Sequence, residues 1–250
     1  MKPKASRKRL DVLLVERGFA GSPQKALAMI LAGEVQVDGQ RAEKVGMPVA
    51  EDAHIEIISR LQKFVSRGGA KLEGALEDFA IEPAGCVCLD IGASNGGFTD
   101  CLLQHGAARV YAVDVNVEQL DWKLRQDSRV IPIKRNAREL RKDDLAEQVD
   151  LVVIDVSFIS VLKVISPAVG VARPSAVFLV LVKPQFELRR QDIGPGGIVK
   201  DQILHDKAIL TVRECVASVG LESLGVRPSH LLGAEGNQEY FLHARKKTLE

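Results

Sequence analysis

Six short apolar runs alternate with segments of helical character between residues 86 and 226, and this alternation constrains the fold more than any other feature. The runs are rich in Val, Ile and Leu and cover residues 86–91, 109–113, 130–133, 150–154, 176–182 and 221–226. Continuous apolar strands separated by helices are typical of a parallel sheet that is buried on both faces. We therefore expect an α/β fold whose ligands bind beyond the carboxyl ends of the strands.

The first 60 residues differ from this body in charge and in pattern. Residues 1–72 contain 13 Lys and Arg against 8 Asp and Glu, whereas residues 73–250 contain 21 against 25. Two helices, a hairpin and a third apolar run at 54–58 are expected from the cap and turn residues Gly18, Ser22, Pro23, Gly33 and Asp38-Gly39. A basic α+β module on a mildly acidic body suggests that the module binds a polyanion.

The sequence shows no sign of a membrane segment or of a metal site. No apolar run approaches the ~20 residues that span a bilayer, and the basic N-terminus lacks the apolar core of a signal peptide. The four cysteines form no repeated CxxC pattern, which indicates buried thiols in a reducing compartment. We expect a soluble, cytoplasmic protein without a metal ion.

The first apolar run ends in a glycine-rich loop, "LDIGASNGGFTD". Its glycine spacing differs from the GxGxxG of dinucleotide-binding proteins. Asp90 lies two residues before the first glycine, where a carboxylate would repel a pyrophosphate but attract a cation. S-adenosyl-L-methionine carries an ammonium and a sulfonium, so the loop favours this cofactor. The residues expected to contact it are Gly92, Ser94, Gly96, Gly97 and Phe98.

The next two runs end in polar residues that suit the rest of the same cofactor. Asp114 ends the second run, where a carboxylate can accept hydrogen bonds from a ribose diol. Asn136-Ala137 follows the third run, where an amide could bind an adenine edge. Because three such signals occur at successive strand ends, we predict an S-adenosylmethionine site in preference to a dinucleotide site.

The later strand ends indicate which group receives the methyl. Asp155 ends the fourth run, Lys183 ends the fifth, and Glu239 begins an edge-like run near the C-terminus. Enzymes that methylate base amines carry two prolines after the acid, and Val156-Ser157 stands here instead; a Pro-Cys nucleophile for base carbon is also absent from the sequence. A ribose 2′-hydroxyl is a weak nucleophile whose proton must be removed or held. Lysines and carboxylates suit that task.

The motifs together resemble two known families. Residues "RLDVLLVERG" and "SPQKALAMILAGEVQVDG" resemble the S-four-type RNA-binding domain, whose basic residues would here be Arg7, Arg9, Lys25 and Arg41. Nearly the whole chain resembles the TlyA (haemolysin A) family of FtsJ-like ribose 2′-O-methyltransferases, through "SRGGAKL", "LDIGASNGGFTDCLLQ", "DLVVIDVSFIS", "LVLVKPQFE", "GPGGIV" and "GNQEYF". The chain departs from the family near the adenosine end of the cofactor site, at Asn116-Val117-Glu118 and just before Asn136.

This second resemblance implies a substrate, a fold and a catalytic tetrad. The substrate would be ribosomal RNA or ribosomal subunits, with a cytidine ribose as the usual target. The fold would be the Rossmann-like class I methyltransferase fold, a mainly parallel seven-stranded sheet flanked by helices. The tetrad falls on Lys71, Asp155, Lys183 and Glu239, and Glu187 is an alternative for the fourth member.

The expected organisation is a domain at 1–62, a linker at 63–70 and a methyltransferase domain at 71–250. In the linker, Arg67 is placed to contact RNA phosphate. The glycine-rich loop 188–200 would be a mobile lid or a plain surface loop. Two other functions stay open: a non-catalytic RNA-binding assembly factor and a membrane-active haemolysin, although no membrane-active segment is evident.

Overall fold

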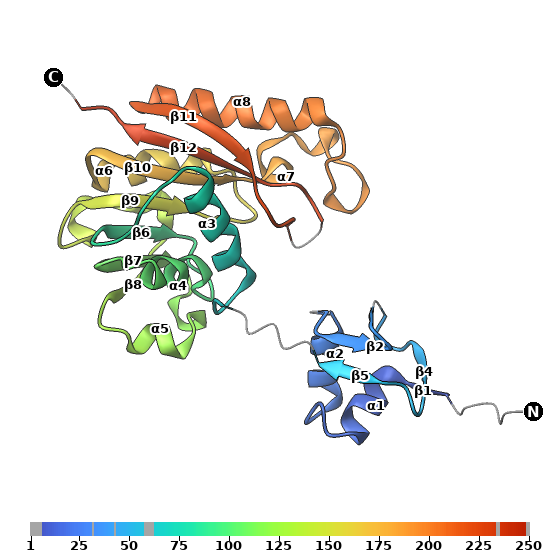
Figure 1. The fold of residues 1–250 in the computed structure, drawn as a ribbon. Helices are drawn as coiled ribbons and strands as arrows, with labels where there is room; N and C mark the ends of the chain where they lie inside the picture. The colour runs from blue at the N-terminus through green and yellow to red at the C-terminus, as the bar shows by residue number, and fades with distance from the viewer. Residues whose placement is uncertain (1–6, 32, 43, 58–62, 234–235, 249–250) are drawn as a thin grey trace, which may run out of the picture. The chain divides into compact units, whose positions relative to one another are not determined.

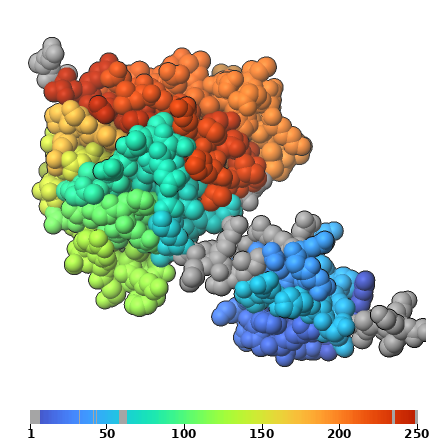
Figure 2. Space-filling view, in the orientation of Figure 1, coloured from blue at the N-terminus to red at the C-terminus, as the bar shows by residue number. Residues whose placement is uncertain are grey.

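The computed structural model describes residues 7–31, 33–42, 44–57, 63–233 and 236–248. They form two compact units, Met1–Gln62 and Lys63–Glu250, which we call the N-terminal and C-terminal units (Figures 1 and 2).

The N-terminal unit contains the two helices and the hairpin that the sequence predicts. Its elements are β1 (Arg7–Arg9), α1 (Leu10–Glu16), α2 (Pro23–Leu31), β2 (Val35–Val37), β3 (Gln40–Arg41), β4 (Pro48–Ala50) and β5 (Ile55–Ile57). Ser22 Oγ accepts a hydrogen bond from Lys25 N at 3.2 Å, so the predicted helix cap is confirmed. Asp38 and Gly39 both have positive φ, 51° and 78°, as the tight turn between β2 and β3 requires.

One part of this unit was missed by the sequence analysis. β1 pairs antiparallel with β4 to form a second small sheet. The sequence of β1 is Arg-Lys-Arg, which has neither an apolar face nor β-branched residues, so no local signal predicts a strand there.

The C-terminal unit is built on a seven-stranded sheet in the order β11-β12-β10-β9-β6-β7-β8. The strands are β6 (Val87–Ile91), β7 (Arg109–Asp114), β8 (Val130–Lys134), β9 (Val149–Ile154), β10 (Ala172–Val182), β11 (Leu221–Pro228) and β12 (Tyr240–Lys246). Strands β6 to β10 run parallel, and β12 is antiparallel to both of its neighbours. The predicted mainly parallel, Rossmann-like class I methyltransferase sheet is therefore confirmed.

The prediction of an edge position for the last run is wrong. β12 lies between β10 and β11, and its residues Phe241 and Leu242 are 1% and 0% exposed. An interior strand must be apolar on both faces, and "YFLHA" satisfies that condition once the flanking strands cover it.

Helices cover both faces of this sheet (Figure 1). Alternate residues of each strand point to opposite faces, and the core accordingly divides into two clusters. The helices α6 (Leu162–Val171) and α8 (Gln202–Ser218) cover one face, and α3 (Arg67–Asp78), α4 (Gly97–Gln104) and α5 (Trp122–Gln126) cover the other. The remaining helical segments are α7 (Pro184–Glu187) and the 3-10 turns Val117–Gln119, Ala137–Glu139, Lys142–Asp144, Arg190–Asp192 and Pro195–Gly197.

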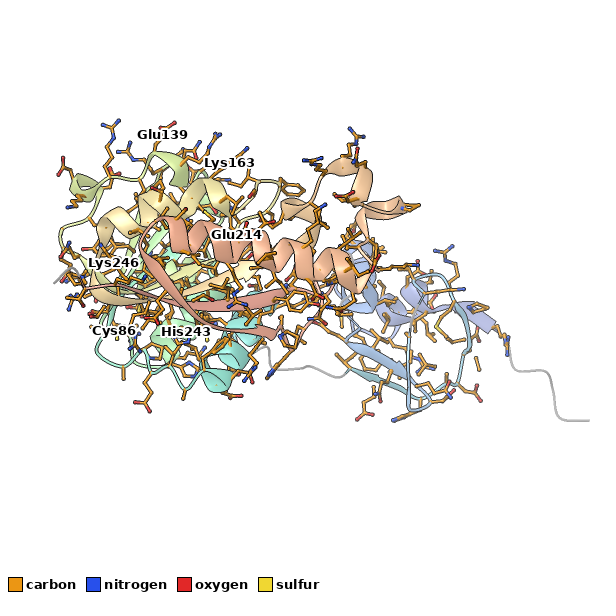
Figure 3. The ribbon with its side chains drawn as sticks, turned by 90° about the horizontal axis from the view of Figure 1, so that it is seen from above. Cys86, Glu139, Lys163, Glu214, His243 and Lys246 are labelled. Atoms are coloured by element: carbon orange, nitrogen blue, oxygen red, sulfur yellow. The ribbon has the colours of Figure 1, made fainter. Side chains whose placement is uncertain are left out.

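Lys246, at the end of β12, is hydrogen-bonded to the end of helix α6. Its Nζ donates to Val169 O at 2.8 Å and to Ala172 O at 2.6 Å, and both carbonyls lie at the carboxyl end of α6 (Figure 3). A lysine at this place satisfies carbonyls that the helix itself leaves unpaired.

Residues 63–70, which the sequence predicts to be a linker, are packed against α4. Val65 N donates to Asp100 Oδ2 at 2.8 Å, and Gln104 Nε2 donates to Lys63 O at 2.8 Å. Phe64 is 3% exposed, and a Cβ on Gly69 would lie 2.3 Å from its ring. The structured C-terminal unit thus begins at Lys63.

Candidate active site

The site begins where β6 and β9 end, side by side. These strands are parallel neighbours, and the chain order of the sheet reverses between them, which is where open α/β sheets bind ligands. The loops that follow touch: Asp155 N donates to Ile91 O at 2.9 Å. A Cβ on Gly92 would lie 2.2 Å from Asp155 O, so only glycine allows this approach.

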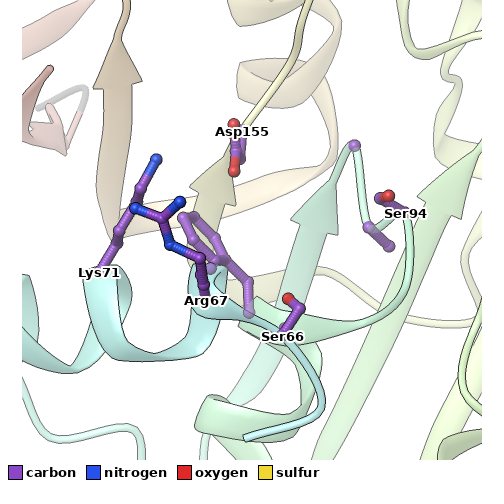
Figure 4. A pocket seen from close by; sticks show the side chains of 10 residues that line it. Ser66, Arg67, Lys71, Ser94 and Asp155 are labelled. Atoms are coloured by element: carbon purple, nitrogen blue, oxygen red, sulfur yellow. The ribbon is translucent and has the colours of Figure 1, made fainter. Parts of the chain in front are cut away.

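A cavity of about 200 Å³ opens at these strand ends (Figure 4). It brings the glycine-rich loop together with Asp155 and with the first turns of α3, and its lining residues are Ser66, Arg67, Gly68, Lys71, Gly92, Ala93, Ser94, Gly97, Phe98 and Asp155. Two residues of the expected tetrad therefore share one cavity with four of the expected cofactor-binding residues. Gly96, Asp90, Asp114, Asn136 and Ala137 do not line it.

The four residues of the expected tetrad form two ion pairs. Lys71 Nζ lies 2.6 Å from Glu239 Oε2, and these side chains are only 10% and 3% exposed. Lys183 Nζ lies 2.5 Å from Asp155 Oδ1. The register of the sheet explains why the pairs are neighbours: Val182 pairs with Tyr240, so the residues just beyond them, Lys183 and Glu239, lie at the same end of β10 and β12.

Glu187, the alternative fourth member, has other partners. Its Oε1 accepts from Val161 N at 2.9 Å and its Oε2 accepts from Ser160 Oγ at 2.5 Å. These bonds hold the start of α6, and burial raises the pKa of the Glu187 carboxyl above its ordinary value. The geometry favours Glu239, since that carboxylate contacts Lys71.

The motif "GNQEYF" fixes the position of Glu239 by holding its neighbours. Asn237 Oδ1 accepts from Val199 N at 2.9 Å, and its Nδ2 donates to Gly197 O at 3.0 Å. His205 contacts Val199 O through Nε2 and the Tyr240 hydroxyl through Nδ1, both at 2.9 Å. The end of loop 188–200 is thus bonded, directly or through His205, to the residues on both sides of Glu239, and the lid over 188–200 stays a prediction.

Helix α3 contacts the segment that precedes Glu239. Arg67 Nη2 donates to Leu232 O at 3.1 Å, and His230 Nε2 lies 3.0 Å from Asp78 Oδ2. In Figure 2 the cyan surface of α3 accordingly runs beside the red C-terminal segment. Arg67 therefore supports the site itself, and its predicted contact with RNA phosphate stays a prediction.

Asp90 is a buried organiser of the glycine-rich loop. It is 0% exposed, and its Oδ2 accepts from Thr99 Oγ1 at 2.6 Å. Its Oδ1 has no hydrogen-bond partner among the residues that the structure describes. Burial raises the pKa of this carboxyl to about 7. The carboxylate thus links β6 to the first turn of α4 on either side of the glycine-rich loop, and its predicted contact with the cofactor stays a prediction.

Asp90 should make stability depend on pH. An acid whose pKa is about 7 in the fold and 3.8 in the unfolded chain contributes stability below pH ~4 and loses it as the pH rises through 7. Asp90→Asn cannot ionise, so it should gain up to about 4 kcal/mol relative to the wild type between pH 4 and 8. Denaturant unfolding of both proteins across this range measures the difference; a constant difference would contradict an ionisable buried Asp90.

Asp114 joins two strand-end loops. Its Oδ2 accepts from Ser94 N at 2.9 Å and its Oδ1 accepts from Asn116 N at 2.9 Å. Ser94 has a φ of 49°, which this bond helps to hold. Asn136 Oδ1 accepts from Arg138 N at 3.2 Å, so the amide caps the turn that begins at Ala137. The proposed contacts of Asp114 and Asn136 with a nucleoside stay predictions.

The residues predicted to bind RNA in the N-terminal unit differ in their surroundings. Arg7 and Lys25 are exposed. Arg9 makes a two-point contact with Asp11, Nε to Oδ1 at 3.0 Å and Nη2 to Oδ2 at 2.8 Å. The side chain of Arg41 lies outside the described part of the chain. RNA binding by each of these residues stays a prediction.

The residues present fit S-adenosylmethionine. The cavity is lined by the glycine-rich loop and by Asp155. The Asp114 carboxylate accepts a hydrogen bond from Ser94 N, and Ser94 belongs to the same lining. Backbone groups and carboxylates are the donors and acceptors that a ligand with two cationic groups and a ribose diol requires. The fold and this site together define a class I methyltransferase that uses S-adenosylmethionine.

Comparison with known proteins identifies the family. The model of the FtsJ-like methyltransferase family matches residues 64–246, and the model of the S4 domain matches residues 8–55. The chain therefore belongs to the FtsJ-like methyltransferases, in the branch that contains TlyA and hemolysin A, with an RNA-binding S4 domain at its N-terminus. It is an enzyme, and its methyl donor is S-adenosylmethionine.

Three relatives illustrate the similarity. The 16S/23S rRNA (cytidine-2′-O)-methyltransferase TlyA of Mycobacterium tuberculosis is 46% identical over 98% of this chain and 92% of its own. Hemolysin A of Brachyspira hyodysenteriae is 41% identical over 94% of this chain and 98% of its own. The solved structure of a candidate hemolysin from Streptococcus thermophilus is 36% identical, covers 98% of this chain and 90% of its own, and has a TM-score of 0.77.

Two of these relatives carry a hemolysin name. Within the residues that the structure describes, no helix combines the length and the apolar character that crossing a membrane requires.

Proposed function

We propose that this enzyme transfers a methyl group to a ribose 2′-hydroxyl of ribosomal RNA, with cytidine as the target nucleoside. The observation that carries the proposal is the single cavity that joins the glycine-rich loop to Lys71 and Asp155, each paired with a further buried residue of opposite charge. A 2′-hydroxyl needs help with its proton and alignment with the donor, and this arrangement supplies both. The relative from Mycobacterium tuberculosis is named for the same reaction.

The residues of the site divide this work. When bound, S-adenosylmethionine supplies a methyl group on a sulfonium that leaves without acid assistance. Lys183 enters the step as the neutral amine, accepts the hydroxyl proton and becomes an ammonium, whose charge Asp155 beside it compensates. Lys71 donates a hydrogen bond to the attacking oxygen, and Glu239 fixes the direction of the Lys71 amine. In-line alignment of the oxygen with the methyl carbon completes the requirement.

An aromatic pair with one exposed ring, beside the site, suits the target base. Phe158 is 87% exposed, and its ring centroid lies 5.6 Å from that of Phe186. Its φ is 66°, an uncommon and costly conformation for a bulky residue. Exposed aromatic rings stack on unpaired RNA bases. Phe158 follows Asp155 by three residues and Phe186 follows Lys183 by three, so the pair lies next to the catalytic lysine and acid.

Phe158→Ala should weaken the binding of RNA more than the binding of the cofactor. Loss of one base stack corresponds to about 1–3 kcal/mol, so the KM for RNA should rise about tenfold while the affinity for S-adenosylmethionine is unchanged. Steady-state kinetics and calorimetry give the two values. Leu210→Ala, which removes another exposed apolar side chain on α8, is the matched control and should change neither. Equal KM values for Phe158→Ala and the control would remove Phe158 from the RNA contact.

The substrate class is tested by supplying different RNA. Purified enzyme with tritiated S-adenosylmethionine should label ribosomal subunits or ribosomal RNA, and transfer RNA should stay unlabelled. Because its substrate is ribosomal, we place the enzyme in the cytoplasm. Binding of ribosomal RNA without any transfer would favour the assembly-factor function instead.

A further inference from the structure

The structure gives Lys183 a partner outside the tetrad. Its Nζ donates a hydrogen bond to Ser157 Oγ at 2.9 Å. Asp155 Oδ1 is closer, at 2.5 Å, but this oxygen is not aligned to accept a hydrogen bond from any described residue. Asp155 thus acts as a counter-charge to Lys183, whereas the hydrogen bond to Ser157 orients the Lys183 amine.

We propose that Ser157 is a positioning residue that orients Lys183 Nζ toward the 2′-hydroxyl, an inference that rests on the function proposed above. An amine nitrogen has three positions besides its carbon. Ser157 takes one of them through its hydrogen bond, and Asp155 lies beside the nitrogen as a counter-charge, so a position is left for the substrate oxygen. Lys71 differs, because among the described residues its hydrogen bond runs to the carboxylate of Glu239. Lys183, in preference to Lys71, is therefore the residue oriented to accept the proton of the 2′-hydroxyl.

The loops that carry the two residues are held together independently of this bond. Beyond Asp155 and Lys183, the loop after β9 meets the segment after β10 at two further pairs, Phe158 with Phe186 and Ser160 with Glu187. Removal of the Ser157 hydroxyl leaves both in place, so the segment should keep its fold. The effect of Ser157 on Lys183 can therefore be separated from an effect on the loop.

Ser160 is a matched control for Ser157. It lies in the same loop, and its hydroxyl contacts Glu187 and accepts from Leu162 N at 3.2 Å, whereas the hydroxyl of Ser157 contacts Lys183. Ser160→Ala removes the same atom and disturbs the start of α6. A general weakening of the loop would lower activity in both variants, whereas loss of orientation at Lys183 would do so in Ser157→Ala alone.

The first measurement needs neither RNA nor cofactor. In protein labelled with ¹⁵N-lysine, the Nζ protons of Lys183, assigned by their absence in Lys183→Met, should exchange slowly with water because they are held. The signal should persist in Ser160→Ala and be lost in Ser157→Ala. An equal signal in both variants would overturn the proposal, even if the wild-type protein transferred no methyl group and the proposed function failed.

The second measurement is kinetic. Ser157→Ala should lower kcat about tenfold, as expected for one hydrogen bond to a charged group, with KM for RNA and affinity for S-adenosylmethionine unchanged. Ser157→Thr keeps a hydroxyl and should restore most of kcat, and Ser160→Ala should stay within about twofold of wild type. An active wild-type enzyme with an unchanged kcat in Ser157→Ala would reject the role of Ser157 and leave the proposed function standing.

Discussion

Replacing Lys183 with methionine should lower methyl transfer by about 10²–10⁴-fold while binding of S-adenosylmethionine is retained, because a positioned acid–base group contributes an effect of this size. Methionine keeps the apolar stem of the 7% exposed lysine and removes only its nitrogen. Asp155, whose side chain is 23% exposed, can then be solvated through the cavity that it lines, so the fold should persist.

Single-turnover kinetics and calorimetry test this expectation. Lys163→Met is the control, since Lys163 is an exposed lysine of α6 and its loss should leave transfer unchanged. Retention of more than about a tenth of the wild-type rate in Lys183→Met would contradict a direct role for Lys183 in handling the proton.

Breaking the Lys71–Glu239 pair should cost both stability and activity, but the two losses should respond differently to a second substitution. Both side chains are nearly buried, and loss of one partner leaves the other charge uncompensated, at about 3–5 kcal/mol. Lys71→Met and Glu239→Gln should each destabilise the protein by this order. The double variant should recover much of the free energy of unfolding, because no unpaired charge is left, yet transfer should stay lost.

Urea unfolding and methyl transfer assays of the four proteins form a double-mutant cycle. Glu187→Gln provides the comparison for the choice of the fourth residue: it also alters a largely buried carboxyl but touches Ser160 and Val161 instead of a lysine. It should lower stability and spare most of the transfer activity. A large loss of transfer in Glu187→Gln with activity preserved in Glu239→Gln would reverse the assignment.

Local patterns were sufficient to predict most of the fold. Each of the six apolar runs corresponds to a strand, and Ser22, Pro23 and Gly33 delimit α2 as their capping chemistry predicts. Patterning could not predict the place of β12, since insertion between β10 and β11 depends on contacts far along the chain. The ion pair from Glu239 to Lys71 spans 168 residues, and no local signal distinguishes Glu239 from Glu187.

The chemistry of single side chains was harder to predict than their location. Asp90 was expected to contact the cofactor; the structure buries its side chain against Thr99, a contact that no local pattern indicates, and the contact with the cofactor stays a prediction. Ser157 and Phe158 stand in a motif that served to exclude base methylation and to support the family resemblance, and neither residue was given a role of its own. Their roles depend on partners in the segment after β10, which only the folded chain brings near.

The position of the methyl group on the nucleotide tests the central claim most directly. Alkali cleaves RNA through the free 2′-hydroxyl, so a methyl group on that oxygen leaves a resistant dinucleotide. Ribosomal RNA labelled by the enzyme with tritiated S-adenosylmethionine should release its label after alkaline digestion in one resistant dinucleotide that begins with cytidine, and Lys183→Met should yield none. Label recovered in mononucleotides would place the methyl group on a base and contradict ribose 2′-O-methylation.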